Sequence, residues 1–439
     1  MASTYLTRNM ATQGSSIYGT FSCWFKLSND NLTGGFLGHY FSNAYNFDIC
    51  MQLGNIEVAD YRTAYVLRKR TTAKYRDLNA WYHLYVAIDR SLATAADRCK
   101  IYVNGERITD FQSSEDQDYS QQTSGGHSGA VSMNNDYTAR VGLRYGSSDF
   151  FDGSITHMHW VDGSVIDIAQ FGSTDATTGE WKINTNSTVA DYGTNGFFIL
   201  KDGNTITDQS SGGSYDFSLG GGTLTKTEDN ASNNFATLNK LSSKGTFSYG
   251  NTEVEHSTGG TTYETTTTTL GMTSGKYYCE AKITYDNNYP GFGIASTNSI
   301  EVTKLESDWL GKTSNSYGYF LDGVIYNNGS TIASGQSTFA TNDIIGMALD
   351  LDSAQNTLKF YKNGSLVNTT NITTNSNGWF FGTTHNNTKT AARSKFNFGN
   401  GYFRSDAVSS AGTNASNNGI FEYDVPSGYT ALSTKGLNL

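Results

Sequence analysis

The stretch Cys99-Lys-Ile-Tyr-Val-Asn-Gly-Glu-Arg-Ile-Thr109 decides the fold class, because two runs of alternating apolar and polar residues flank the dipeptide Asn104-Gly105. Asn-Gly accepts positive φ at both central positions of a type I′ turn, whose twist matches that of two antiparallel strands. The stretch Thr357-Leu-Lys-Phe-Tyr-Lys-Asn-Gly-Ser-Leu-Val367 repeats this arrangement in the other half of the chain. The sequence therefore predicts one β-hairpin in each half.

Runs upstream of the first hairpin have the same alternating pattern. In Gly19-Thr-Phe-Ser-Cys-Trp-Phe-Lys26, Phe21, Cys23 and Phe25 fall on one face of a strand, and residues 81–89 are apolar on both faces. Turn residues interrupt such runs every ~8–12 residues, as in β-sandwiches. The 439 residues include 47 glycines, 28 tyrosines and two prolines. We predict an all-β protein with two antiparallel, jelly-roll-like β-sandwich domains in tandem.

Residues 202–234 are dense in Gly, Ser, Thr and Asp and nearly free of long apolar side chains, which is typical of a connection between domains. We therefore place the first sandwich with a C-terminal extension at 1–222, a linker at 223–240, the second sandwich at 241–405 and a C-terminal tail at 406–439. The sequence Asn-Ala-Ser-Asn-Asn occurs at 230–234 and again at 414–418. This repeat predicts two equivalent linkers, one at the end of each sandwich.

The charge balance disfavours ligands that bind through phosphate neutralisation. The chain has 30 Lys and Arg against 40 Asp and Glu, a net charge of −10, so we expect no nucleic acid as a partner. Arg68, Lys69 and Arg70 form a local basic stretch, which we interpret as a solvated strand face.

The sequence shows no apolar run of about 18 residues and no signal-peptide pattern, so we expect neither membrane insertion nor secretion. The four cysteines form no CxxC motif. We predict that they are small core residues of a protein made in a reducing cytosol.

The first half resembles the concanavalin A-like, laminin-G type sandwich over roughly residues 5–170. The resemblance rests on an opening strand, two central strands and a closing strand: Phe21-Ser-Cys-Trp-Phe-Lys26, Trp81-Tyr-His-Leu-Tyr-Val-Ala-Ile-Asp89, Ile101-Tyr-Val-Asn-Gly105 and Phe151-Asp-Gly-Ser-Ile-Thr-His-Met-His-Trp-Val-Asp-Gly163.

The second half resembles a SPRY domain, because five stretches follow that family's order. They are Gly275-Lys-Tyr-Tyr-Cys-Glu-Ala-Lys282, Gly291-Phe-Gly-Ile-Ala295, Tyr317-Gly-Tyr-Phe-Leu-Asp-Gly323, Asp343-Ile-Ile-Gly-Met-Ala-Leu-Asp-Leu-Asp352 and Phe360-Tyr-Lys-Asn-Gly364.

Four further stretches are similar to virion proteins of tailed phages of aquatic bacteria, cyanophages especially. They are Tyr5-Leu-Thr-Arg8, Phe171-Gly-Ser-Thr-Asp-Ala-Thr-Thr-Gly-Glu-Trp181, Tyr192-Gly-Thr-Asn-Gly-Phe-Phe198 and Asp424-Val-Pro-Ser-Gly-Tyr-Thr-Ala-Leu432. The resemblance implies a component of a phage particle rather than a cellular enzyme.

Calcium is the one cofactor that the resemblance to laminin-G modules suggests, because such modules often hold this ion at the rim of the sandwich. The loop Ser113-Ser-Glu-Asp-Gln-Asp-Tyr119 offers the carboxylates of Glu115, Asp116 and Asp118, which are ligands of the kind that calcium prefers. These three residues are the candidate metal site, but a solvated acidic loop needs no metal, so we expect no cofactor and keep calcium as the alternative.

Glycan binding needs exposed rings on which sugars stack, with amide or carboxylate groups beside them. Two loops in the second half meet this requirement, residues 285–290 and residues 308–315. We predict Tyr289, Trp309 and Asn315 as ligand-binding residues, near the loops with which SPRY domains grip their partners. Packing inside the protein is the alternative for each ring.

The sequence offers no convincing catalytic group. Retaining glucanases with the concanavalin-like fold carry Glu-x-Asp-x-x-Glu on a strand, but the nearest match, Glu422-Tyr-Asp-Val-Pro-Ser427, ends in serine and is interrupted by Pro426. His157 and His159 stand at strand spacing without a carboxylate, so we interpret them as packed or hydrogen-bonded rather than as metal ligands. We expect no catalytic residue and no enzyme.

Together these observations predict a non-enzymatic structural protein of a phage virion, made in the host cytoplasm and placed on the capsid or tail surface as a fibre, appendage or decoration. Its expected partners are other virion proteins, further copies of itself in a homo-oligomer, and a glycan or protein of the host surface. Two alternatives stay open, a spacer that binds only other virion subunits and a depolymerase of host polysaccharide.

Overall fold

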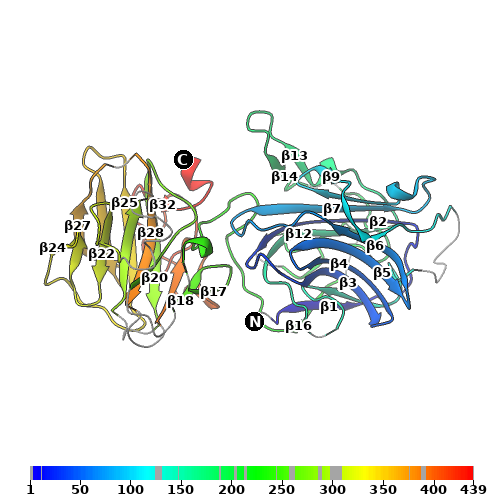
Figure 1. Ribbon diagram of the computed structural model, residues 1–439, viewed down its shortest axis with the longest axis horizontal. Coiled ribbons are helices and arrows are strands. Elements are labelled where there is room, and N and C mark those ends of the chain that lie inside the picture. The colour runs from blue at the N-terminus through cyan, green and yellow to red at the C-terminus, as the bar shows by residue number, and fades with distance from the viewer. Residues whose placement is uncertain are drawn as a thin grey trace. The chain divides into compact units, whose positions relative to one another are not determined.

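The computed structural model describes residues 3–10, 12–123, 131–146, 148–186, 189–201, 205–211, 215–243, 245–256, 263–284, 289–296, 309–374, 376–386 and 392–438. The chain divides into two compact units, Met1–Lys226 and Thr227–Leu439. Strands make up both units (Figure 1), which confirms the predicted all-β fold. Within the described ranges, no helix is long and apolar enough to cross a membrane.

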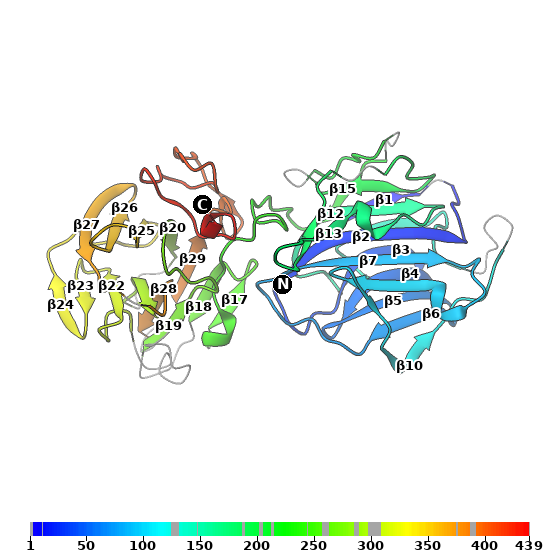
Figure 2. The same cartoon turned by 90° about the horizontal axis from the view of Figure 1, so that it is seen from above.

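Two antiparallel sheets form the body of the first unit (Figures 1 and 2). Eight strands of its described part form one sheet, in the order β10 (Phe111–Gln117), β6 (Tyr65–Thr71), β5 (Asn55–Arg62), β4 (Tyr45–Gln52), β3 (Gly34–Ser42), β11 (Thr138–Val141), β1 (Tyr5–Asn9) and β16 (Ser218–Gly221). Six form the other sheet, in the order β15 (Phe197–Ile199), β12 (Gly153–Asp162), β2 (Tyr18–Leu27), β7 (Trp81–Asp89), β8 (Cys99–Val103) and β9 (Glu106–Ile108). A separate pair consists of β13 (Gly172–Thr174) and β14 (Trp181–Ile183).

The core of the first unit lies between these two sheets. Phe21, Cys23 and Phe25 of β2 are all fully buried in it, which confirms the predicted alternation. On β7, Val86 faces this core, whereas Tyr85 belongs to a second apolar cluster on the other face of the sheet. Strand β7 is therefore covered on both sides, as its sequence predicts.

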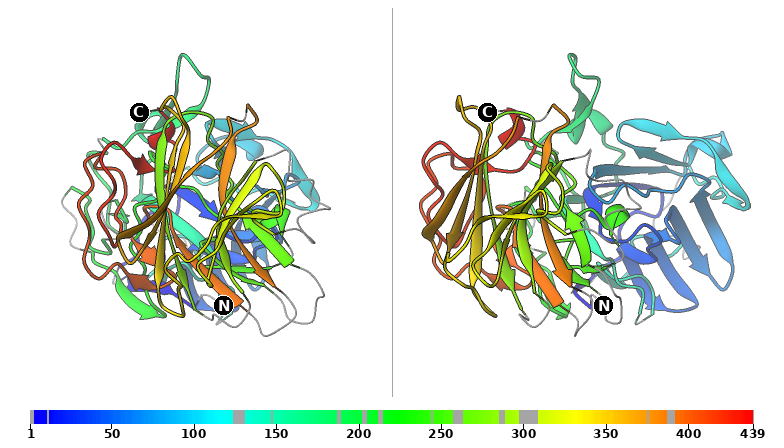
Figure 3. Two further views of the ribbon diagram at one scale, coloured as in Figure 1. Left: turned by 90° about the vertical axis from the view of Figure 1, so that its left-hand side faces the viewer. Right: turned by 60° about the vertical axis from the view of Figure 1, so that its left-hand side comes forward.

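The second unit also contains two large sheets, and Figure 3 brings its strands to the front. Within the described residues, one sheet has the order β17 (Thr246–Ser248), β18 (Glu253–His256), β29 (Ala392–Asn397), β20 (Lys276–Ile283), β25 (Ile344–Asp350), β26 (Thr357–Lys362) and β27 (Ser365–Asn371), and β32 (Thr430–Ala431) also pairs with β20. The other sheet has the order β19 (Tyr263–Thr267), β28 (Trp379–Asn386), β21 (Gly291–Ser296), β22 (Ser316–Phe320), β23 (Ile325–Asn327) and β24 (Ser330–Ala333). A short pair, β30 (Tyr402–Phe403) and β31 (Asp406–Ala407), completes the unit.

Both predicted hairpins are confirmed. Strands β8 and β9 meet at Asn104 and Gly105, whose φ angles are 50° and 82°. Strands β26 and β27 meet at Asn363 and Gly364, with φ angles of 47° and 80°. Positive φ at both central residues is what a type I′ turn requires.

The structure places the segments that the sequence assigned to a linker and a tail inside the second unit. Phe235 and Leu238, from the expected linker, are buried in its apolar clusters. Phe421 and Leu432, from the expected tail, are buried in the same two clusters. Strand β32 of this C-terminal segment runs parallel to β20, so both ends of the unit's chain pack onto the sandwich.

The two Asn-Ala-Ser-Asn-Asn segments form a pair within the second unit, and the prediction of one linker per sandwich is therefore wrong. The Nδ2 of Asn233 donates to the Oδ1 of Asn418 at 2.8 Å. In each copy the first asparagine accepts from the backbone N–H of the serine, at 3.0 Å for Asn230 and 3.2 Å for Asn414. The repeat thus encodes two similar turns, which join the start and the end of the unit.

Glu280 of β20 holds the C-terminal segment. Its buried carboxylate accepts the backbone N–H groups of Glu422 and Tyr423 at 2.8 and 2.9 Å, the hydroxyl of Tyr278 at 3.2 Å and the Nδ2 of Asn397 at 3.2 Å. Burial raises the pKa of Glu280 from 4.5 to about 7, although these donors lower it. The folded state therefore binds the Glu280 proton more tightly than the unfolded chain.

We predict that this proton makes the second unit less stable as the pH rises. Between pH 4.5 and about 7 the unfolded carboxyl is ionised while the folded one keeps its proton, so this group lowers the free energy of unfolding by about 3 kcal/mol across that window. Urea denaturation at pH 5 and pH 7.5 measures the change. Glu280→Gln is expected to make the free energy of unfolding nearly independent of pH in this window. Glu255→Gln, which removes a half-buried ion pair with Arg393, is expected to keep the pH dependence of the unmodified chain. An equal slope in Glu280→Gln and the unmodified chain would contradict the assignment.

Candidate functional site

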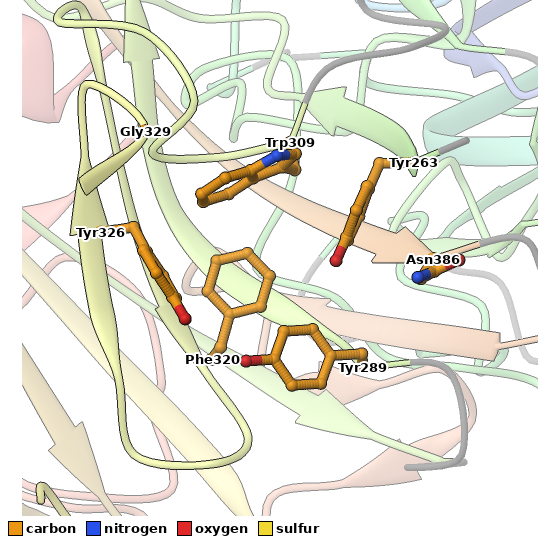
Figure 4. Close-up of a pocket in the computed structure, with 7 residues that line it drawn as sticks. All are labelled: Tyr263, Tyr289, Trp309, Phe320, Tyr326, Gly329 and Asn386. Atoms are coloured by element: carbon orange, nitrogen blue, oxygen red, sulfur yellow. The ribbon is translucent and has the colours of Figure 1, made fainter. Parts of the chain in front are cut away.

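A pocket of about 480 Å³ opens on the outer face of the sheet that contains β19, β28, β21, β22, β23 and β24. Tyr317 and Tyr319 of β22 point into the core, so the next residue, Phe320, points to the other face. The pocket is lined mainly by aromatic side chains, which Figure 4 shows: Tyr263, Tyr289, Trp309, Phe320, Tyr326, Gly329 and Asn386.

Phe320 forms the floor of the pocket. It lies opposite Gly291 of β21, and a Cβ at position 291 would stand 2.8 Å from the Phe320 ring, so the glycine leaves room for this ring. The ring of Tyr289 stacks beside it, with the centroids 5.2 Å apart and an angle of 29° between the planes. Phe320 is 1% exposed because the surrounding aromatic rings cover it.

Trp309 forms one wall, and the turn that follows it is fixed to the sheet. The backbone N–H of Lys312 donates to the carbonyl of Trp309 at 2.9 Å, and that of Gly311 donates to the Oγ of Ser316 at 2.9 Å. The carbonyl of Leu310 lies above Gly318, where a Cβ would come within 2.3 Å of its oxygen. The missing side chain at Gly318 therefore lets this turn rest on β22.

Strand register supplies the other two walls. Tyr326 of β23 pairs with Gly318 of β22, and Tyr263 of β19 pairs with Asn386 of β28. Directly paired residues share one face of a sheet, so these side chains stand on the same side as Phe320. Four strands from three separate parts of the sequence, β19, the β22–β23 hairpin and β28, thus contribute to one pocket.

The hydroxyl groups of Tyr289 and Tyr263 form hydrogen bonds within the pocket. Tyr289 has a φ of 48° and donates its hydroxyl to the Oδ2 of Asp322, which lies in the turn after β22. Burial raises the pKa of Tyr289, and hydrogen bonds to Asp322 and Tyr326 raise it further. Burial also raises the pKa of Tyr263, which a hydrogen bond with Asn386 partly offsets. The pocket therefore offers aromatic faces and hydroxyl groups, with one carboxylate beside Tyr289.

Comparison with known families identifies most of the strands around this pocket, because the family model of the SPRY domain matches residues 276–401. The chain contains a SPRY domain. The match begins at the first residue of β20 and ends after β29. A SPRY domain is a protein-interaction module and generally not an enzyme.

Solved SPRY structures are similar to this part of the chain. The SPRY domain of human HERC1 is 20% identical, with a TM-score of 0.28 and coverage of 33% of this chain and 87% of that one. A human SPRY domain is 18% identical, with a TM-score of 0.27 and coverage of 33% and 90%. The PSpry domain of TRIM65 is 15% identical, with a TM-score of 0.29 and coverage of 37% and 91%. No curated protein matches the chain.

Two of the three ligand-binding residues that the sequence predicts line the SPRY pocket, Tyr289 and Trp309. The third, Asn315, is not one of the lining residues, and its carbonyl accepts the backbone N–H of Ser296 at 3.0 Å. Residues 285–288 and 308 of the two predicted loops lie outside the described residues. Ligand binding by all three residues stays a prediction.

The sequence analysis missed Tyr263, Phe320, Tyr326 and Asn386. Tyr326 begins a stretch that is typical of a plain hairpin turn, Tyr326-Asn-Asn-Gly329, so only its pairing with β22 reveals its direction. Phe320 could have been found, because it follows the alternating pair Tyr317 and Tyr319 and breaks their apolar alternation. For Tyr263 and Asn386, the sequence contains no local signal.

The carboxylates predicted as a calcium site do not converge in the structure. The expected loop is the strand β10, where Glu115 pairs with Arg68 and Arg70 at 2.9 and 2.8 Å. Asp116 and Asp118 instead both pair with Lys69, at 2.7 Å for Asp118. In the part of the chain that the structure describes, no group of three or more His, Cys, Asp or Glu side chains is placed to hold a metal ion.

The basic stretch Arg68 to Arg70 is not the solvated strand face that the sequence predicts. Lys69 is 2% exposed and lies at the edge of the core. Arg68 and Arg70 both contact the buried carboxylate of Glu57. Arg68 and Arg70 therefore belong to an ion-pair network around the buried Glu57, whereas Lys69 pairs separately with Asp116 and Asp118. Sequence spacing does not show this network, because Glu57 and Glu115 come from the two strands that flank β6.

Both histidines are packed or hydrogen-bonded, as the sequence predicts, but they do not share a face. The Nδ1 of His157 hydrogen-bonds the Oγ1 of Thr156 at 2.9 Å. A register shift between Thr156 and His159 on β12, with a φ of 49° at His157, breaks the strand spacing. His159 is buried, its Nδ1 hydrogen-bonds the hydroxyl of Tyr192 at 2.7 Å, and its ring stacks on Phe198 at 3.8 Å. Burial lowers the pKa of His159 well below its ordinary value, so this side chain is neutral and packed.

Proposed function

We propose that this chain is a non-enzymatic binding protein of a phage virion, placed on the capsid or tail surface as a fibre, appendage or decoration and assembled in the host cytoplasm. The first unit would be a concanavalin A-like sandwich that supports the SPRY domain. Support for the virion role comes from the four stretches that are similar to proteins of tailed phages. Support for binding comes from the SPRY match.

The aromatic pocket is the observation that carries the proposed binding role. Its lining residues stand on the outer face of a rigid sheet, and Trp309 and Tyr289 are partly exposed at its rim. Partly exposed aromatic side chains around a concave site are the residues that dominate binding energies in protein interfaces. The proposed partner is a protein of the host surface or of the particle, held by several copies of the chain in a homo-oligomer.

The virion role is tested on purified phage particles whose genome encodes this chain. Mass spectrometry of the particles and labelling with an antibody against the SPRY domain are expected to detect the chain at regular positions on the capsid or tail. Detection of the chain only in the lysate, and never in the particles, would contradict the role.

We predict that Trp309→Ala weakens partner binding about 30-fold, as truncation of an interface hot spot does. Surface plasmon resonance with host-envelope vesicles measures the effect, and Phe41→Ala, which removes a 65% exposed ring of the first unit, is the control. Protease treatment of the vesicles is expected to abolish binding if the partner is a protein. Loss after periodate treatment alone would identify a glycan instead, and release of reducing ends would reveal a depolymerase. Absence of any binding would favour a spacer.

A further inference from the structure

The rings of the SPRY pocket form an open box. Trp309 and Tyr326 are both nearly perpendicular to the Phe320 floor, at 79° and 87°, and they are at 85° to each other. The ring of Tyr263 lies 6.0 Å from that of Trp309. Figure 4 shows Trp309, Tyr263 and Tyr326 edge-on around Phe320 and Tyr289, which are seen face-on. We call these five side chains the aromatic box. Figure 4 shows Trp309, Tyr263 and Tyr326 turning their faces toward the space over Phe320, whose own ring is 1% exposed.

Ring faces carry negative partial charge, so walls that turn their ring faces inward favour a cation between them. None of the seven described lining residues carries a charge of its own. The nearest carboxylate that contacts the box is Asp322, which accepts from the hydroxyl of Tyr289. A bound cation would therefore meet no positive side chain among the described lining residues and would gain from this carboxylate.

The polar groups of the box decide which cation fits. An unmodified ammonium carries three N–H donors that need acceptors when water is removed. The hydroxyl of Tyr289 donates to Asp322 and that of Tyr263 is hydrogen-bonded with Asn386, so each offers an ammonium only a remaining lone pair rather than a free hydroxyl. A methylated ammonium has few or no N–H groups to satisfy, and its methyl groups pack against ring faces. A sugar would instead require a broad flat platform, which rings in three perpendicular planes do not supply.

We propose that the aromatic box binds a methylated ammonium group, presented by a methylated lysine side chain of a partner protein. The volume of about 480 Å³ accommodates this group together with its alkyl stem. The protein source rests on the proposed function, because it requires that the pocket engages a protein. The preference for a methylated cation does not depend on that function: it rests on the ring geometry, on Asp322 and on the hydrogen bonds of the Tyr289 and Tyr263 hydroxyls.

Calorimetric titration of the full chain tests the preference with four probes: a short peptide with Nε-trimethyl-lysine, the same peptide with unmodified lysine, its neutral tert-butyl isostere, and phosphocholine. The trimethylated peptide is expected to bind about tenfold more tightly than the neutral isostere, which has the same shape without the charge. The unmodified peptide is expected to bind more weakly still. Equal binding of the charged peptide and the isostere, or no binding of either, would overturn the proposal.

Three variants separate recognition from folding. Trp309→Ala is expected to remove binding of the trimethylated peptide, whereas Phe41→Ala in the first unit is expected to retain it. Asp322→Asn keeps the rings. It is expected to weaken binding of the trimethylated peptide several-fold and to leave binding of the isostere unchanged. If Asp322→Asn weakens both probes equally, the carboxylate does not act on the cation, and the proposal fails.

The remaining outcomes show whether the methylated ammonium comes from a protein or from a choline headgroup. They also show whether the proposed binding function stands without it. Tighter binding of phosphocholine than of the peptide would overturn the protein source, since the group would then come from a choline headgroup. Saturable binding of methyl glycosides without binding of any cation would overturn the proposal in favour of a sugar. If the probes fail while Trp309→Ala still abolishes binding to host-envelope vesicles, the methylated ammonium is wrong and the binding function stands.

Discussion

Replacing Glu57 with alanine is expected to lower the free energy of unfolding of the first unit by about 3–5 kcal/mol. Glu57 of β5 is fully buried and accepts from Arg70 Nε at 2.8 Å, from Arg68 Nε at 3.1 Å and from an Arg144 guanidinium nitrogen at 2.6 Å. Removal of this carboxylate leaves Arg144, whose side chain is 5% exposed, with Gln52 as a partner, and it leaves the partly exposed Arg68 and Arg70 with Glu115. A buried charge without its partner costs far more than an exposed one.

Urea denaturation of the full chain, followed by hydrogen exchange of peptides from β4 to β6, assigns the loss to the first unit. The matched control is Asp97→Ala, which removes a surface ion pair with Arg107 and is expected to leave the transition where it is. If the Glu57→Ala and Asp97→Ala chains unfold at the same denaturant concentration, water or Glu115 compensates the arginines, and the network does not stabilise the unit.

Local signals in the sequence account for much of the fold. Asn104-Gly105 and Asn363-Gly364 predicted their hairpins because a two-residue turn depends on its own φ angles. The alternation of Phe21, Cys23 and Phe25 predicted the buried face of β2, since the period of a strand is fixed by its backbone. Each of these features depends on residues within one or two strands.

Features that depend on pairing between distant strands were not predicted. Lys69 looked solvated because its partners Asp116 and Asp118 lie on β10 or just after it, more than 40 residues away in sequence. The SPRY pocket was predicted only where its residues sit in recognisable loops, at Tyr289 and Trp309. Tyr263 and Asn386 join it through the register of β19 with β28, which no local pattern specifies.

The prediction of residues 406–439 as a tail was wrong for the same reason, because the order of this segment depends on contacts that are distant in sequence. Its apolar residues are sparse among Gly, Ser and Asn, which is typical of a tail. In the structure Phe421 packs its edge against the ring of Tyr278 at 5.1 Å and shares a cluster with Phe235 and Tyr429. The segment is ordered by contacts with β20 and with the start of the unit, rather than by its own alternation.

Phe421→Ala is therefore expected to destabilise the second unit by about 3–5 kcal/mol, the loss typical of emptying a buried phenylalanine site. The side chain is 1% exposed, and its removal also loosens the neighbouring N–H groups of Glu422 and Tyr423 that Glu280 accepts. Urea denaturation with hydrogen exchange of the β20 peptide measures the loss.

The control for this substitution is Leu241→Ala, at a side chain that is 85% exposed in the same unit, where a change within about 0.5 kcal/mol is expected. The pair distinguishes a tail from part of the sandwich, because a tail would tolerate both substitutions equally. A Phe421→Ala chain as stable as Leu241→Ala would mean that residues 406–439 only rest on the unit. A large loss confined to Phe421→Ala would mean that the SPRY sandwich needs strands from beyond residue 401 to close its core.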